Sequence, residues 1–139
     1  MPAPHQATLL PLAQRTTTAS NVRSDSFSAI WKKAIFLLNV TAAAGDATDY
    51  LDVYIDILGP DGATWINAVH FTQIAGNSAA IKHYAILDST AVAATTFNVT
   101  TDCTSGVTKP YIWGPTVSAR HTLVATGDVT FSVTAHFIY

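Results

Sequence analysis

The sequence predicts an all-β fold: a two-layer antiparallel β-sandwich, of the jelly-roll or immunoglobulin-like type, with an extended N-terminal arm. Apolar and polar residues alternate in about seven segments from Trp31 onward, which is the period of a half-buried strand. Turn-forming Gly, Pro, Asn and Asp residues separate these segments. All nine acidic residues are Asp, so the Glu–Lys pairs typical of exposed helices are missing. Two half-apolar sheets bury each other's dry faces, which favours a sandwich.

Composition limits the classes of partner. Charged residues make up 12% of the 139 residues, about half the usual quarter, and the net charge is −2. The seven basic residues form no stripe that could follow a phosphate backbone, so we expect no nucleic-acid partner. No window of about 18 apolar residues occurs, so we expect no membrane span. The single cysteine, Cys103, excludes an internal disulfide and is expected to be a buried small apolar residue.

The chain divides at about residue 28. Residues 1–28 are rich in Pro, Thr, Ser and Gln, and they carry a short apolar patch at Leu9, Leu10 and Leu12. We expect this segment to be an arm that lies along another subunit and becomes ordered there; the alternative is a disordered tail with no partner. Residues 29–139 are expected to form the single sandwich domain.

Two strands with consistent faces open the domain. In "KAIFLLNVTA" the apolar residues stand at even positions, and in "YLDVYIDIL" they stand at odd positions. If "AAAGDATD" closes a hairpin between them, Val40 lies opposite Leu51 and Phe36 opposite Ile55. The two strands would then share one dry face, made of Ala34, Phe36, Leu38, Val40, Leu51, Val53, Ile55 and Ile57.

Asp52 and Asp56 fall on the opposite, outer face of this predicted hairpin. There Asp52 lies across from Asn39 and Asp56 lies diagonal to Lys33, a surface pairing worth about 0 to 1 kcal/mol. Strand positions four apart are about 13 Å from one another, which is too far to chelate one ion or to act as a glycosidase pair. A catalytic or metal site would therefore need Asp49 or Asp61 as well, and a structural role is favoured.

The same outer face carries an apolar and tyrosine patch. Its members are Ile35, Leu37, Tyr50 and Tyr54, and a patch of this kind is typical of contact surfaces. We expect either another layer of this chain or another subunit to cover it.

The middle of the chain continues the alternation. "GPDG" has the formula of a type I turn, which makes Asp61 a turn residue. "TWINAVHFTQI" is expected to place Trp65, Asn67, Val69 and Phe71 on one side. "IKHYAIL" predicts a shorter strand, and residues 88–115 predict a long surface loop with one or two short strands.

A last hairpin is expected over "TVSARHTLVATGDVTFSVTAHFIY". A three-residue turn at 126–128 would align Leu123 and His121 inward, and a two-residue turn would align Val124 and Thr122 instead. The two-residue turn would bring His121 and His136 onto one face as possible metal ligands. The hydrophobic pattern favours the three-residue turn. The second strand is expected to bury Val129, Phe131, Val133, Ala135 and Phe137.

Catalytic and cofactor motifs are missing from the sequence. It contains no G-x-S-x-G, no Gly-rich phosphate loop, no H-E-x-x-H and no C-x-x-C, so we expect neither an enzyme nor a bound metal or cofactor. Trp65, Tyr111 and Trp113 could form a sugar-stacking platform, although such aromatics are more often core or interface anchors.

The order of these segments resembles that of small virion structural proteins of tailed bacteriophages. The resemblance extends from about Ser20 to Tyr139 and rests on "AIFLLNVTAAAGDATDYLDVYIDI", "GPDGATWINAVHFTQI", a Trp-containing loop and "SARHTLVATGDVTFSVTAHFI". It implies a non-enzymatic β-sandwich in the virion, assembled in the host cytoplasm as a homo-oligomer, that binds the major capsid protein or other virion proteins. Capsid decoration or cementing is the expected role.

The sequence is also compatible with three other functions. One is a head-tail connector or tail component, and another is a carbohydrate-binding module that uses Trp65, Tyr111 or Trp113. A hydrolase that uses Asp52, Asp56 or Asp61 is the third.

Overall fold

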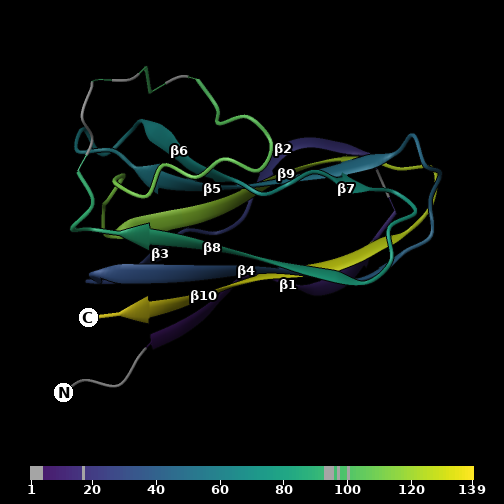
Figure 1. Ribbon diagram of the computed structural model, residues 1–139, viewed down its shortest axis with the longest axis horizontal. Coiled ribbons are helices and arrows are strands. Elements are labelled where there is room, and N and C mark those ends of the chain that lie inside the picture. Colours follow the sequence, from purple (N-terminus) through teal and green to yellow (C-terminus); the bar gives the residue numbers. More distant parts are fainter. Residues whose placement is uncertain (1–4, 17, 93–95, 97, 100) are drawn as a thin grey trace.

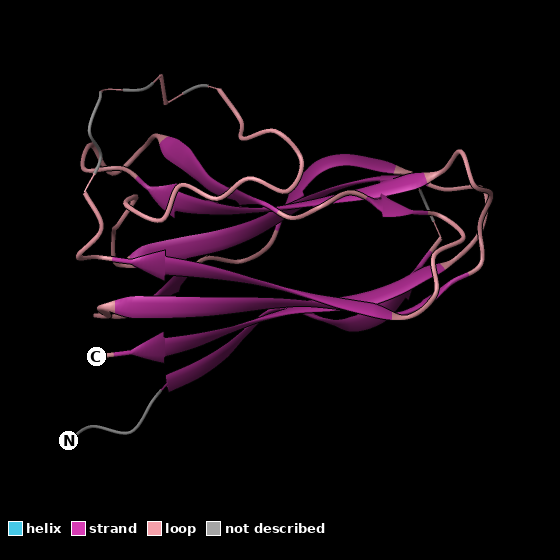
Figure 2. Ribbon diagram, viewed as in Figure 1, coloured by secondary structure: helices cyan, strands magenta, loops and turns pink. Residues whose placement is uncertain are grey.

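The computed structural model describes residues 5–16, 18–92, 96, 98, 99 and 101–139 and shows two antiparallel sheets packed face to face (Figure 1). This part of the chain contains strands, turns and loops and no helix (Figure 2), and therefore no helix that could cross a membrane. The predicted all-β antiparallel sandwich is confirmed.

Four strands form the first sheet, sheet A, in the order β1-β10-β4-β8. Their bounds are β1 His5–Arg15, β10 Val129–Ile138, β4 Lys33–Ala43 and β8 Ile81–Asp88. Sheet B has the order β2-β9-β5-β6, with β3 paired to β9 and β7 paired to β5. Its strands are β2 Ala19–Arg23, β9 Thr116–Val124, β5 Tyr50–Leu58, β6 Trp65–His70, β3 Phe27–Ser28 and β7 Ile74–Ala75.

The core lies between the two sheets and matches the faces that the alternation predicts. The even positions of β4 and the odd positions of β5 are buried, and so are the five predicted residues of β10. Phe36, Leu38, Ile55 and Phe131 have no exposed surface, and each side chain of this size contributes about 1.5 to 3 kcal/mol when it is fully buried. Cys103 is also buried, as expected.

The predicted strand partners are wrong, although the faces are right. β4 and β5 do not form a hairpin: β4 pairs with β10 and β8 in sheet A, and β5 pairs with β9 and β6 in sheet B. β9 and β10 are likewise split between the sheets. Alternation records which side of a strand is dry, and that side is the same whether the next strand pairs beside it or faces it across the core. Leu123 and His121 do point inward, as the three-residue turn predicts.

The N-terminal segment is not a separate arm, which corrects the predicted division at residue 28. β1 pairs with β10 along its length, while β2 and β3 pair with β9, so this segment completes both sheets. Leu9 and Leu10 are buried in the core of their own chain and cannot bind another subunit; Leu12 is exposed. Two register shifts in β1 allow the consecutive Leu9 and Leu10 both to be buried, and such a bulged strand shows no clean alternation in sequence.

A β-bulge also changes the predicted face of β6. Asp56 pairs with Asn67 and Ile55 pairs with Val69, so Ala68 is an extra residue between the two pairs. Val69 therefore points into the core, whereas Asn67 points to the outer face beside Asp56. The prediction that all four alternating residues of this segment share one side is wrong because the bulge breaks the period.

Two ends of the sandwich are closed by tight turns. The predicted turn at 59–62 is present, with a backbone bond from the Gly62 N–H to the Gly59 carbonyl, and Asp61 accepts bonds from the N–H groups of Ala63 and Thr64. At the other end, one carboxylate oxygen of Asp49 accepts bonds from the N–H and the hydroxyl of Thr126. These bonds lower the pKa of Asp49, and equivalent bonds from Thr64 and Ala63 lower that of Asp61 to about 2.

Candidate functional site

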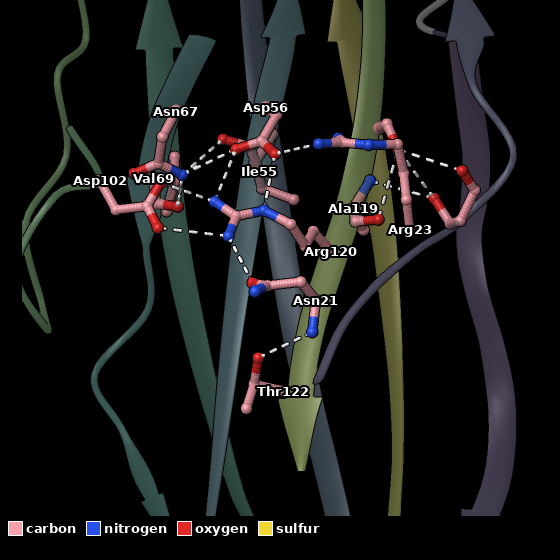
Figure 3. Close-up of polar contacts among 12 residues, drawn as sticks. Asn21, Arg23, Ile55, Asp56, Asn67, Val69, Asp102, Ala119, Arg120 and Thr122 are labelled. Atoms are coloured by element: carbon pink, nitrogen blue, oxygen red, sulfur yellow. Dashed lines mark hydrogen bonds and ion pairs between the residues drawn. The ribbon is translucent and has the colours of Figure 1, made fainter. Parts of the chain in front are cut away.

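The outer face of sheet B is covered by this chain and carries a buried ionic network (Figure 3). Only 2% of Asp56 is exposed, and its Oδ2 lies 2.9 Å from both Arg120 Nε and Arg23 Nη2. The side-chain amide of Asn67 donates to the other oxygen at 2.8 Å. The carboxylate of Asp56 therefore meets two guanidinium groups and one amide, which satisfies a charge that would be costly to bury alone.

Arg120 carries the network outward to the edge strand β2 and to the loop around residue 102. Its terminal nitrogens donate to Asp102 at 2.8 Å and to the side-chain oxygen of Asn21 at 2.8 Å. Burial disfavours the charged form of Arg120, but its bonds to Asp56 and Asp102 more than compensate and raise its pKa. The network thus fastens the β2 segment and the loop around residue 102 to the middle of sheet B.

Aromatic rings complete this covered face. The guanidinium of Arg120 lies 4.1 Å from the ring centre of Tyr54, and that of Arg23 lies 4.4 Å from the ring of Trp65. Such cation–π contacts contribute about 0.5 to 2 kcal/mol each. Tyr54 and Trp65 are therefore engaged within their own chain.

Asp52 belongs to a second buried cluster on the same face. Its carboxylate lies 2.9 Å from Nε2 of His70, whose Nδ1 is 2.8 Å from the carbonyl oxygen of Cys103. Gln73 donates to both oxygens of Asp52 at 3.1 Å, and Tyr54 stacks on the His70 ring at 4.2 Å. Both ring nitrogens of His70 are engaged, so the imidazole acts as a bridge between sheet B and the covering loop.

The predicted surroundings of the aspartates are corrected by these contacts. Asp52 and Asp56 do lie on the outer face, but they are buried rather than exposed, and their partners are not Asn39 and Lys33, which lie in the other sheet. Asp49 and Asp61 stand in end turns and join neither cluster. Among the described residues, no group of three or more His, Cys, Asp or Glu side chains is placed to hold a metal ion.

The predicted interface patch is divided between the two outer faces. Tyr50 and Tyr54 lie on sheet B, and Ile35 and Leu37 lie on sheet A. The sequence left open whether this patch is covered by the same chain or by another subunit. Tyr54 is covered by the same chain. Ile35 and Leu37 instead line an open groove of about 340 Å³ whose other residues are Gln6, Tyr84, Thr134, Ala135 and His136.

Tyr84 and Ile86 extend this open surface and were missed in the sequence. Tyr84 is 68% exposed and pairs with Leu37, and Ile86 is 52% exposed and pairs with Ile35. Alternation in "IKHYAIL" could have shown that Tyr84 and Ile86 point away from Ala85 and the buried Leu87. We call the surface formed by Ile35, Leu37, Tyr84 and Ile86 the sheet A patch.

The two histidines of the last strands lie on opposite sides of the molecule. His136 is on the outer face of sheet A, 3.3 Å from the side-chain nitrogen of Gln6. His121 is buried in the core, edge-on to Phe131, and its Nδ1 has no hydrogen-bond partner. Burial, and then the nearby charge of Arg15, lower the pKa of His121. His121 and His136 therefore do not form a pair of metal ligands.

Trp113 is the predicted aromatic that remains available at the surface. It is 47% exposed, and its indole N–H donates to the Trp31 carbonyl at 2.8 Å, which fixes the ring. The ring borders a groove of about 440 Å³ between the turn at 59–62 and residues 113–116. Tyr111, by contrast, packs against the core.

Comparison with known proteins identifies no family. No family model matches the chain, and no curated protein matches it. Among solved structures, a chain of infectious bursal disease virus, Gx strain, aligns with 98% of this chain at 11% identity and a TM-score of 0.37. The VP2 subviral particle of infectious bursal disease virus aligns with 97% at 12% identity and a TM-score of 0.33. The chain spans 40% of the length of each, and likeness at this level does not identify a function.

Proposed function

We propose that this protein is a non-enzymatic structural component of a virus particle, and specifically a decoration protein of a tailed-bacteriophage capsid. The observation that carries the proposal is the contrast between the two outer faces. Sheet B is covered by its own chain through the Asp56 and Asp52 clusters, whereas sheet A has Ile35, Leu37 and Tyr84 around an open groove and leaves Ile86 exposed beside them.

The sheet A patch has the composition of a protein-binding surface. Its centre is aliphatic and aromatic, and its surroundings are the uncharged or weakly basic side chains of Gln6, Thr134 and His136. Interfaces between proteins combine an apolar, aromatic-rich centre with a polar rim in this way. The patch stands on β-strands, so its side chains are held in place before binding and little ordering entropy is lost.

Repetition would turn such a modest contact into firm attachment. Each copy that binds a neighbour is held close to the next site, so the second contact forms at a high effective concentration. A shell with many copies of a small rigid sandwich fits this requirement, and the phage resemblance in the sequence supports the same role. If the protein instead belongs to the head-tail region, the same apolar patch would attach it to neighbouring proteins.

Particles from the source of this sequence provide the test. We expect the protein to co-band with intact capsids in a density gradient, at a constant copy number measured by quantitative mass spectrometry. Purified protein should also bind particles that lack it. Tyr84→Asp and Ile86→Asp should abolish binding, because each places a charge in an apolar contact.

A control variant tests whether the position matters. Ile30 is 79% exposed and lies outside the sheet A patch, so Ile30→Asp makes the same chemical change elsewhere and should bind normally. Absence of the protein from purified particles would contradict the proposed function. Equal loss of binding in all three variants would contradict the assignment of the surface.

Trp113 supports carbohydrate binding as a second candidate function. A fixed, half-exposed indole beside a groove could stack on the apolar face of a sugar ring. Trp113→Ala should then abolish binding on a glycan array, while Tyr84→Asp should leave it unchanged. No glycan binding by the unmodified protein would remove this candidate.

A further inference from the structure

We propose that the outer face of sheet A binds a second copy of this chain, face to face, about a two-fold axis that crosses the strands at the level of Ala85. This inference rests on the docking role proposed above for the same face and names its partner: on the particle, the sheet A patch meets a neighbouring copy of this chain, and loss of that contact removes the repeated attachment. A two-fold interface requires a surface that is complementary to itself when it is reversed. The strand register of sheet A meets this requirement in its apolar residues and in its charges.

The apolar residues form two adjacent rows across the sheet. One row contains Ile35 and Ile86 on neighbouring strands, followed by His136 and Gln6. The next row contains Leu37 and Tyr84, followed by Thr134 and Thr8. Ala85 lies between the rows and pairs with Phe36. Rotation about an axis at this level places each row over the other row of the partner, so Ile86 meets Tyr84 and Ile35 meets Leu37.

The charges lie at equal distances on either side of the axis. Lys82 is three residues before Ala85 and Asp88 is three residues after it, and both belong to the outward-facing set of β8. The rotation therefore places each Lys82 over Asp88 of the partner, twice per dimer. The strands of stacked sheets cross at about 30°, which displaces facing residues sideways, and the long lysine side chain can reach across this displacement. An axis along β8 would instead oppose each Lys82 to its own copy, which is unfavourable.

The position of Lys33 is also compatible with a two-fold axis across the strands. It stands beside Asp88 in the strand register, with Nζ 3.7 Å from the carboxylate, and both side chains are partly exposed. Lys82 stands beside Asn39 in the equivalent position of the other row. Reversal therefore brings Lys33 over the neutral Asn39 and avoids a repulsive contact.

The size of the face predicts weak association. Four strands about 4.8 Å apart and eight residues of about 3.3 Å each give a footprint of about 500 Å² per copy. The total of about 1,000 Å² is at the lower limit for a specific interface. We therefore expect a dimer that forms at high protein concentration, as it occurs on a particle, and dissociates in dilute solution.

Sedimentation equilibrium of charge variants tests the proposal at low ionic strength, where charge contacts are least screened. The unmodified protein should dimerise reversibly. Lys82→Asp and Asp88→Lys should each weaken dimerisation about tenfold or more, because two attractive contacts become repulsive. A mixture of the two variants should dimerise nearly as well as the unmodified protein, because the mixed pair restores both contacts.

Two controls separate the pairing from other effects. Asp25→Lys changes the net charge as Asp88→Lys does but lies at an exposed position outside this face, so it should dimerise normally. Asp88 also accepts bonds from the N–H and hydroxyl of Thr90, so Asp88→Lys loses a turn contact that Lys82→Asp keeps. Recovery in the mixture can come only from the pairing of the two positions.

The outcomes distinguish this inference from the proposed function. A chain that stays monomeric at all concentrations, or variants that do not recover when mixed, would overturn the two-fold arrangement. Protein that is monomeric but still bound to particles through Tyr84 and Ile86 would leave the proposed function in place. Dimers that never associate with particles would overturn the proposed function and leave the two-fold arrangement intact.

Discussion

Arg120 donates from Nε to Oδ2 of Asp56 at 2.9 Å across neighbouring strands of sheet B, and 2% of Asp56 is exposed. Arg23 approaches the same oxygen at 2.9 Å from the N-terminal part of the chain. This contact between Arg120 and Asp56 explains why the outer face of sheet B is closed. Two guanidinium groups therefore share the carboxylate of Asp56, and only Arg120 has a second carboxylate partner described above, Asp102.

Asp56→Asn should destabilise the protein by about 3 to 5 kcal/mol, because the buried Arg120 loses the carboxylate that it shares with Arg23 and keeps only the half-exposed Asp102. Asp102→Asn is the matched control, since Asp102 also pairs with Arg120 but its side chain is 48% exposed. The control should cost about 1 kcal/mol or less. Urea denaturation of both variants measures the difference. Equal costs would contradict the assignment of Asp56 as the centre of the network.

His121 should make stability depend on pH in the weakly acidic range. Burial, followed by the charge of Arg15, lowers its folded-state pKa below the ordinary 6.5, so the unfolded chain binds its proton more readily. The stability that depends on neutral His121 is therefore fully present above about pH 6.5. As the pH drops from there toward the folded-state pKa, the free energy of unfolding falls by at most about 1.4 kcal/mol per pH unit.

Urea midpoints between about pH 7 and pH 5 measure this dependence, in the range where a histidine titrates. His121→Leu should lose less stability than the unmodified protein over the same interval, because the leucine binds no proton. The carboxylates of Asp49, Asp61 and Asp88 have lowered pKa values and act only in stronger acid. Parallel pH profiles for the two proteins would show that His121 is not responsible.

Gly76 and Gly62 should respond very differently to alanine. A Cβ at Gly76 would lie 2.4 Å from the Cβ of Asp49 and 2.7 Å from the Asp46 carbonyl oxygen, so the turn must shift. Gly62 has a positive φ of 68° but nothing within 4 Å of its Cβ position. We expect about 3 kcal/mol or more for Gly76→Ala, at the upper end of overpacking costs, and about 1 kcal/mol for Gly62→Ala. Thermal unfolding gives the order, and a reversed order would contradict the close approach at Asp49.

Leu9 and Leu12 test whether the N-terminal segment is part of the sandwich. Leu9 is 5% exposed in the core, whereas Leu12 is 56% exposed. Leu9→Ala should therefore cost about 2 to 5 kcal/mol through lost contacts and a cavity. Leu12→Ala should stay within about 0.5 kcal/mol of the unmodified protein. Equal and small effects in chemical denaturation would restore the interpretation of this segment as an arm.

Period-two alternation predicted the dry face of β4, β5, β9 and β10 but not their neighbours. A strand buries the same residues whether its successor lies beside it or opposite it, and the connection at 44–49 is compatible with both arrangements. β1 escaped detection because its bulges bury the consecutive Leu9 and Leu10, which removes the alternating signal.

The candidate site was predicted in part for the same physical reason. Ile35 and Leu37 were found because outward-facing apolar residues are visible in an alternating strand. Tyr84 and Ile86 carry the same signal in a shorter strand and could have been included. The burial of Asp56 was not predictable from its own strand, because its cover comes from Asn21, Arg23 and Asp102 at distant positions in the sequence.

The pairing of β1 with β10 has a consequence for folding. In the described part of the chain, eight other strands separate these two partners in the sequence, so β1 and β10 meet only when distant parts of the chain have been brought together. Non-local strand pairing of this kind slows folding. β4 carries Ile35 and Leu37 and lies between β10 and β8, so the sheet A patch gains its full support only when sheet A is complete.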